Sequence, residues 1–347
     1  MADYYLDTNT KRPYSWYDPI TQEESSINIY RIKPTANFTA ADGTEVTTNG
    51  TYGWVQEKAN LDISNGAWVF DNAIVFGDAV VKDQATIHGN AIIYSTGAPG
   101  DSGTHATQVK GQVKVSDNAQ VGIGCTADGT ATIQDNGQLK DSSQLGGTAK
   151  IAENGIVQDD SEVKDSTIQG NAVVQDGSKV YDEATITDAA RVEDACDIIG
   201  KVTLKGNSKI EDNSTIDASV GTIIISEGAR VADFATIITE DQGNTVQISG
   251  NVQVNGVIQN GTTGQTYQAP KISGQVNLSG NARVTGQVVM SEQATLEDNA
   301  QAEQVDFDNL EGTLTLKGTI TISENARAIG TSTYSSGSWK GNTVNGE

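Results

Sequence analysis

Aliphatic residues recur at every sixth position along much of this chain. In the first run they are Val69, Val75, Val81, Ile87 and Ile93, and each follows an alanine by two residues. The spacing returns at Ile133 and, after one omitted residue before Ile168, continues to Ile216. A period of six is neither the period of a helix nor the alternation of a single flat strand. It is typical of hexapeptide repeats and predicts an all-β fold, a parallel β-helix of the solenoid type.

The letters of each hexad fit a short strand followed by a corner. The aliphatic side chain should point inward, and the small residue should sit where a larger side chain would collide with the interior. Gly-Asn, Asp-Asn and Gly-Asp pairs precede the small residue, where the backbone turns and a positive φ is tolerated by these residue types. Three hexads would close a triangular coil of about 18 residues, and coils would stack at the ~4.8 Å spacing between strands.

The hexads resemble those of left-handed parallel β-helix proteins, which include the hexapeptide acyltransferases. The stretch from Tyr30 to Tyr94 resembles a narrower class, the phage- and prophage-encoded hexapeptide-repeat proteins. That resemblance is carried by RIK, by YGWVQEKANL (Tyr52 to Leu61) and by NGAWVFDNAIVFGDAVV. It implies a left-handed β-helix, although ordinary crossover rules would give the opposite hand. It implies no catalytic chemistry.

The positions of the hexads divide the chain into four zones. Residues 1–62 lack hexads and hold most of the aromatic side chains, which predicts a small non-repeat element for capping or attachment. Residues 63–238 should form the regular β-helix, with a loop insertion at 95–111. Residues 239–330 should form a less regular β-solenoid, and residues 331–347 a polar, flexible tail.

Aromatic side chains in the first zone are the candidates for an interface, because they supply large contact areas at low entropic cost. The predicted attachment residues are Tyr14, Trp16, Tyr17 and Trp54. The alternative is that the same side chains only cap the first coil, since a solenoid needs a covered end.

The charge of the chain limits its partners. A formal net charge of −23 argues against nucleic acid and against anionic membranes, because both require a basic surface. The composition is 36% hydrophobic and only 5% aromatic, enough for a narrow interior filled by aliphatic columns. The N-terminal stretch has no apolar core, so we expect no secretion signal, and no segment has the length of a membrane span.

The chain offers little for catalysis. Its two histidines are His88, in an outward slot beside Ile87, and His105, in the loop insertion where an acyltransferase would place its base. Neither has the surroundings of an acyl-donor site, and two histidines cannot supply the three zinc ligands of the related carbonic anhydrases. Cys196 occupies a small-residue slot and should be buried, whereas Cys125 lies in an irregular stretch. We predict a protein that is not an enzyme and uses no cofactor.

Carboxylates one coil apart should form columns along the corners. Asp176, Asp194 and Asp212 make the longest column, and Asp141 with Asp159 and Asp135 with Glu153 make shorter ones. Like charges at ~5 Å repel unless water, cations or protons relieve them. We therefore expect a solvated acidic edge and no metal site; weak binding of a divalent cation by the three aspartates is the alternative.

The function hypothesis that combines these points is a non-enzymatic structural protein of a phage virion, such as a head fibre, tail fibre, spike or decoration component. It would be made in the host cytoplasm, attach to capsid or tail proteins through residues 1–62, and present its C-terminal zone outward, where host-surface carbohydrate is the expected ligand. We expect a homotrimer, because relatives of this fold associate with parallel axes. A phage-encoded intracellular binding protein and a hexapeptide acyltransferase remain as alternatives.

Overall fold

The computed structural model describes residues 3–18, 21–97, 106–261, 264–303, 314–329, 332–341 and 344–345. The fold is all-β, with 49% of residues in strands, and it consists of long ladders of parallel strands, as the hexads predict. The chain divides into two compact units, Met1–Gly170 and Asn171–Glu347, which are described separately.

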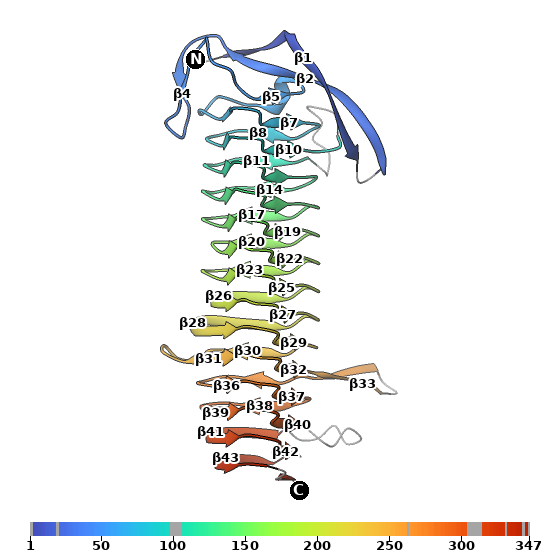
Figure 1. Cartoon of the computed structure of the whole chain (residues 1–347), viewed down its shortest axis with the longest axis vertical. Helices are drawn as coiled ribbons and strands as arrows, with labels where there is room; N and C mark the ends of the chain where they lie inside the picture. Colours follow the sequence, from blue (N-terminus) through green and yellow to red (C-terminus); the bar gives the residue numbers. More distant parts are fainter. Residues whose placement is uncertain are drawn as a thin grey trace. The chain divides into compact units, whose positions relative to one another are not determined.

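The first unit begins with non-repeat elements. A long antiparallel hairpin, blue in Figure 1, is formed by β1 (Tyr4–Asp18) and β2 (Glu23–Pro34). A second, small hairpin is formed by β3 (Phe38–Thr39) and β4 (Glu45–Val46), and a 3-10 turn, η1, spans Lys58–Asn60. Parallel pairing starts with β5 (Trp54–Val55), which pairs with β7, so the first rung lies before the predicted boundary at residue 63.

Three parallel ladders make up the rest of the first unit, drawn as short stacked arrows in Figure 1. The first ladder contains β5, β7 (Ile74–Phe76), β10 (Ile92–Tyr94), β13 (Gln120–Val121), β16 (Gln138–Leu139) and β19 (Ile156–Val157). The second contains β8 (Val80–Val81), β11 (Gln108–Val109), β14 (Thr126–Ala127), β17 (Gln144–Gly146) and β20 (Glu162–Lys164). The third contains β6 (Trp68–Val69), β9 (Thr86–Ile87), β12 (Lys114–Val115), β15 (Thr132–Ile133), β18 (Lys150–Ile151) and β21 (Thr167–Ile168).

The second unit also has three parallel ladders. The first contains β22 (Val173–Val174), β25 (Arg191–Val192), β27 (Lys209–Ile210), β29 (Arg230–Ala232), β32 (Gln253–Asn255), β37 (Arg283–Thr285), β40 (Gln301–Glu303), β42 (Arg327–Ile329) and β44 (Val344–Asn345). The second contains β23 (Lys179–Tyr181), β30 (Thr236–Ile238), β35 (Lys271–Ile272) and β38 (Val288–Met290). The third contains β24 (Thr185–Ile186), β31 (Thr245–Ile248), β36 (Asn277–Leu278) and β39 (Gln293–Leu296).

Four long strands of the second unit turn a corner and so contribute to both of the last two ladders. They are β26 (Asp197–Leu204), β28 (Thr215–Ile225), β41 (Leu314–Ile322) and β43 (Thr333–Trp339). An antiparallel hairpin of β33 (Val257–Gly261) and β34 (Gly264–Gln268) is inserted between rungs.

The buried interior follows the hexad register. Each aliphatic residue singled out by the six-residue spacing is fully buried, and each alanine two residues before it in the first run is buried too. The interior also continues through the gap between Ile93 and Ile133. The inward positions there are occupied by Val109, Val115, Val121 and Ala127. At Ala127 the inward residue is a small alanine in place of a larger aliphatic residue.

The corners reveal two separate roles for the paired corner residues. The first residue of each pair takes the left-handed conformation, as at Asp71 (φ 52°), Asp83 (φ 58°) and Gly89 (φ 65°). The asparagines in the ladder from Asn118 to Asn154 lie outside that region. The amide of each donates to the asparagine of the next rung, from Asn118 to Asn136 at 3.3 Å and from Asn136 to Asn154 at 3.0 Å. Asparagine therefore serves at these corners as a side-chain ladder, whereas Asn213 (φ 56°) is itself a left-handed turn residue.

Three predicted zones differ from the structure. The loop insertion at 95–111 ends sooner, because β11 begins at Gln108; residues 98–105, and with them His105, lie outside the described residues. In zone 239–330 the spacing is broken by insertions such as the β33–β34 hairpin, while parallel pairing continues. The predicted flexible tail contains β43, which pairs along β41, because its Thr- and Ser-rich residues still satisfy a backbone ladder.

Candidate functional site

Most of the predicted attachment residues contact the chain's own first unit. Tyr14 and Trp16 of β1 pack against Phe76, with ring centroids 5.4 and 5.1 Å apart, and Trp54 belongs to the same buried cluster. Tyr17, by contrast, is 60% exposed. The aromatic element therefore covers the first ladder near β5, β7 and β10, and Tyr17 is the member of the predicted set that remains free to meet a partner.

Two arginines from different strands enclose the indole of Trp54. The guanidinium carbon of Arg12 lies 4.3 Å from the ring centroid, and that of Arg31 lies 4.1 Å from it. Arg31 also donates to the carbonyl oxygens of Tyr52 and Asp71 and to Oδ1 of Asn72, the last at 3.1 Å. Cation–π contacts stabilise such stacks. Arg31, the arginine of the RIK segment, thus joins the hairpin to the corner of the next rung.

His88 is not a free surface histidine. Its imidazole stacks on Phe70 with ring centroids 4.3 Å apart, and its Nε2 lies 2.9 Å from Oδ2 of Asp42. Asp42 also accepts the backbone N–H of Thr44, and these contacts hold the pKa of the Asp42 carboxyl below its usual range although burial works in the other direction. His88 fastens the turn between β3 and β4 to the third ladder and so has a structural role.

An open groove lies beside the N-terminal elements. It has a volume of about 890 Å³ and is lined by Tyr4, Phe38, Lys58 and the turn from Leu61 to Gly66. The Tyr4 hydroxyl donates within the chain to the carbonyl oxygens of Lys58 and Leu61 at 2.8 and 2.9 Å. The groove therefore offers aromatic walls beside two carboxylates, Asp3 and Asp62, of which Asp3 already pairs with Lys58 at 3.6 Å.

Both cysteines are free, buried fillers. Burial raises the pKa of Cys125 and of Cys196 to about 12, so neither thiol forms a reactive thiolate near neutral pH. Cys196 fills the small-residue slot, as predicted. Cys125 fills the equivalent slot two residues before Ala127, in a stretch where the sequence pattern had looked irregular.

The predicted acidic column lies along one corner of the second unit. Asp176, Asp194 and Asp212 each adopt a positive φ, and their carbonyl oxygens accept the backbone N–H groups of Ala195, Asn213 and Phe234, each on the next rung. Burial and the neighbouring charges of Asp212, Asp176 and Glu211 raise the pKa of the Asp194 carboxyl. The charges of both neighbours in the column, Asp176 and Asp212, therefore disfavour the ionised form of Asp194.

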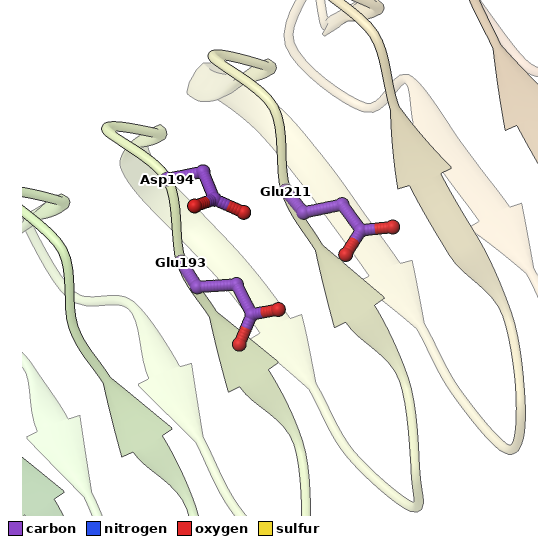
Figure 2. Close-up of side chains that lie close together, drawn as sticks. All are labelled: Glu193, Asp194 and Glu211. Atoms are coloured by element: carbon purple, nitrogen blue, oxygen red, sulfur yellow. The ribbon is translucent and has the colours of Figure 1, made fainter.

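A different set of carboxylates comes closest together. Glu193, Asp194 and Glu211 each place a carboxylate oxygen within 4.8 Å of the others, and Figure 2 shows Glu193 and Glu211 projecting from neighbouring rungs. Two cations already pair with the glutamates of this cluster, since Lys209 pairs with Glu193 and Glu211, and Arg230 pairs with Glu211. Although burial opposes the charged form, these two glutamates raise the pKa of Lys209. The charge that a metal ion would supply is thus supplied by side chains.

Comparison with known proteins adds no assignment. No protein-family model matches the chain, and no curated protein matches it. Within the part of the chain that the structure describes, no helix has the length and apolar character needed to cross a membrane.

Proposed function

We propose that this chain is a non-enzymatic structural component of a phage particle, a head or tail fibre, spike or decoration protein. It attaches through its N-terminal element to capsid or tail proteins and presents its C-terminal zone outward. In this proposal the chain belongs with the phage-encoded hexapeptide-repeat proteins, forms a left-handed triangular β-helix with 18 residues per coil, and assembles as a homotrimer.

The coil geometry is supported by the strand registers. Three ladders per unit fit three faces per coil, and Gln120 lies opposite Gln138 just as Thr126 lies opposite Gln144 and Thr132 lies opposite Lys150. Each pair is separated by one set of three hexads. The left hand rests on the resemblance of the hexads alone.

The observation that carries the attachment role is the pair of exposed tyrosines on the N-terminal hairpin. In the described residues the exposed large hydrophobic side chains are Tyr5 (52%), Tyr17 (60%) and Val220, and the other large hydrophobic side chains are buried or half-buried. Exposed aromatic side chains are typical of a binding surface. The surrounding aromatic cluster holds the hairpin rigidly enough to present them.

Labelling of purified particles with gold-conjugated antibody against this chain, viewed by electron microscopy, tests the particle location. The variant Tyr5→Ser/Tyr17→Ser should fold normally but enter particles roughly tenfold less than the wild type. Val220→Ser, which changes an exposed apolar residue of the second unit, is the matched control and should enter particles normally. Purified wild-type particles that carry no gold label would contradict the proposal.

A further inference from the structure

All four arginines of the second unit lie in one ladder of strands. Arg191 lies opposite Lys209, Lys209 opposite Arg230, and the line continues through Gln253 to Arg283 and through Gln301 to Arg327. We call the five cations the basic row; its members are Arg191, Lys209, Arg230, Arg283 and Arg327. On a chain with a net charge of −23, a line of five cations interrupted only by Gln253 and Gln301 is an uneven distribution that the fold alone does not require.

Part of the basic row is not neutralised within the chain. Lys209 and Arg230 pair with Glu211, and Arg327 pairs with Glu303 at 2.8 Å. Arg283 donates to the hydroxyl of Thr285, and Arg191 is exposed at the start of β25. Neither Arg191 nor Arg283 has a carboxylate partner among the described residues. They can therefore serve a second molecule without breaking an existing ion pair.

A complementary line of carboxylates runs along the corner that follows the same ladder. We call Asp176, Asp194, Asp212 and Asp233 the acidic corner; each is held at a positive φ, between 57° and 59°. Asp176 and Asp194 are exposed, and the other two are half-buried. Among the described residues, one ion pair reaches this corner, from Arg230 to Asp212 at 3.6 Å. Desolvation and like charge, chiefly from Glu211 and Asp233, raise the pKa of Asp212, so a cation from outside would relieve this repulsion.

We propose that the basic row of one copy of this chain docks against the acidic corner of a second copy, in a closed ring of three copies with parallel axes. This inference rests on the homotrimer in the proposed function and assigns its interface. Four successive rungs supply a corner carboxylate (Asp176, Asp194, Asp212 and Asp233), and the last three of them also supply a cation, at the same ~4.8 Å rise. A rotation without a shift along the axis brings residues of equal height together, so the unpaired Arg191 meets Asp194. Such a head-to-tail contact closes into a ring.

Charge reversal on the full-length chain tests the interface, with mass measured by sedimentation equilibrium. The wild type should have three times the mass of one 36.4 kDa chain. Arg191→Asp should raise the concentration for half-dissociation by roughly tenfold or more, and Asp194→Arg should do the same. The double variant Arg191→Asp/Asp194→Arg should restore assembly, because each interface then regains an opposite-charge pair. Higher salt should weaken the wild-type trimer.

Lys205→Asp is the matched control, because it makes the same charge change on an exposed lysine outside the basic row. It should leave the mass unchanged. A trimer that survives Arg191→Asp and Asp194→Arg alike would overturn this interface while leaving the homotrimer intact. A wild-type chain that sediments as a single copy would overturn both the interface and the trimer, whereas the particle labelling described above would still decide the structural role.

Discussion

At the scale of single residues, the inward position of each hexad tolerates little change. Ile186 is fully buried between rungs of the third ladder, whereas Thr187, the next residue, is only half-buried. A buried charge without a partner costs several kcal/mol, because no water or counterion solvates it. The exposed and half-buried positions can keep a carboxylate in contact with water.

Replacing Ile186 with Asp should therefore destabilise the second unit by about 4 kcal/mol or more, and Thr187→Asp should cost under about 1 kcal/mol. Chemical denaturation followed by circular dichroism gives both values. Equal losses for the two variants would show that the register is misassigned.

Corner carboxylates at similar backbone positions differ in what their charge contacts. Asp135 accepts the backbone N–H of Glu153 at 3.0 Å, and this bond lowers the pKa of Asp135. Asp141, one hexad later, makes no such bond in the described residues; burial and the charge of Asp159 raise its pKa. The ionised form is favoured by folding at Asp135 and disfavoured at Asp141.

The two Asp→Asn variants should thus move stability in opposite directions at pH 7. Asp135→Asn should cost a few tenths of a kcal/mol, and that cost should vanish as the pH falls through the lowered pKa of Asp135, where the wild type is protonated as well. Asp141→Asn should add a similar amount, and its advantage should disappear at acidic pH, below the ordinary carboxyl range. Melting temperatures of the three chains at pH 7 and pH 3 check both signs.

At the scale of elements, the N-terminal hairpin is part of the fold of the first unit and not a detachable anchor. It covers Ile74 and Phe76 of β7, and Tyr4, Phe38 and Tyr52 surround the fully buried Trp68 with ring centroids 5.9, 5.1 and 5.3 Å away. Removal of residues 1–62 would expose these side chains. We therefore expect a chain that lacks residues 1–62 to aggregate.

A point substitution separates the structural role of the element from its exposed surface. Trp54→Ala should destabilise the first unit by about 3 kcal/mol or more, because the indole is buried and stacked between Arg12 and Arg31. Tyr17→Ala should change stability by less than about 0.5 kcal/mol. Amide hydrogen exchange along β1, β2 and β7 reports the difference; unchanged protection in Trp54→Ala would contradict the packing described here.

At the scale of the whole molecule, repeat proteins open locally, because each rung contacts mainly its neighbours. The two buried cysteines report on this, since Cys125 lies in the first unit and Cys196 in the second. Their raised pKa values and burial predict that neither reacts with a thiol reagent in native buffer at pH 8.

Trp54→Ala should increase the labelling rate of Cys125 at intermediate urea by roughly tenfold or more, and that of Cys196 much less, because the lost contacts lie in the unit that contains Cys125. Mass spectrometry of the labelled peptides measures both rates. Equal acceleration at the two thiols would instead indicate that the chain unfolds as one cooperative block.

The sequence by itself determined the all-β class, the inward register of the hexad runs and the place of Cys196 in the small-residue slot, because a fixed period reflects a contact that every rung repeats. The place of Cys125 in the same kind of slot became visible only in the structure. Only the tertiary structure decided what the non-repeating residues do. Arg31, His88 and Trp54 acquire their roles from partners in other segments, such as Asp42 for His88, and no local pattern encodes such pairs. The residues of the asparagine ladder and of the basic row are visible in the sequence. However, the number of residues between successive rungs changes wherever an insertion occurs. Their alignment could therefore be recognised only once the strand register was known.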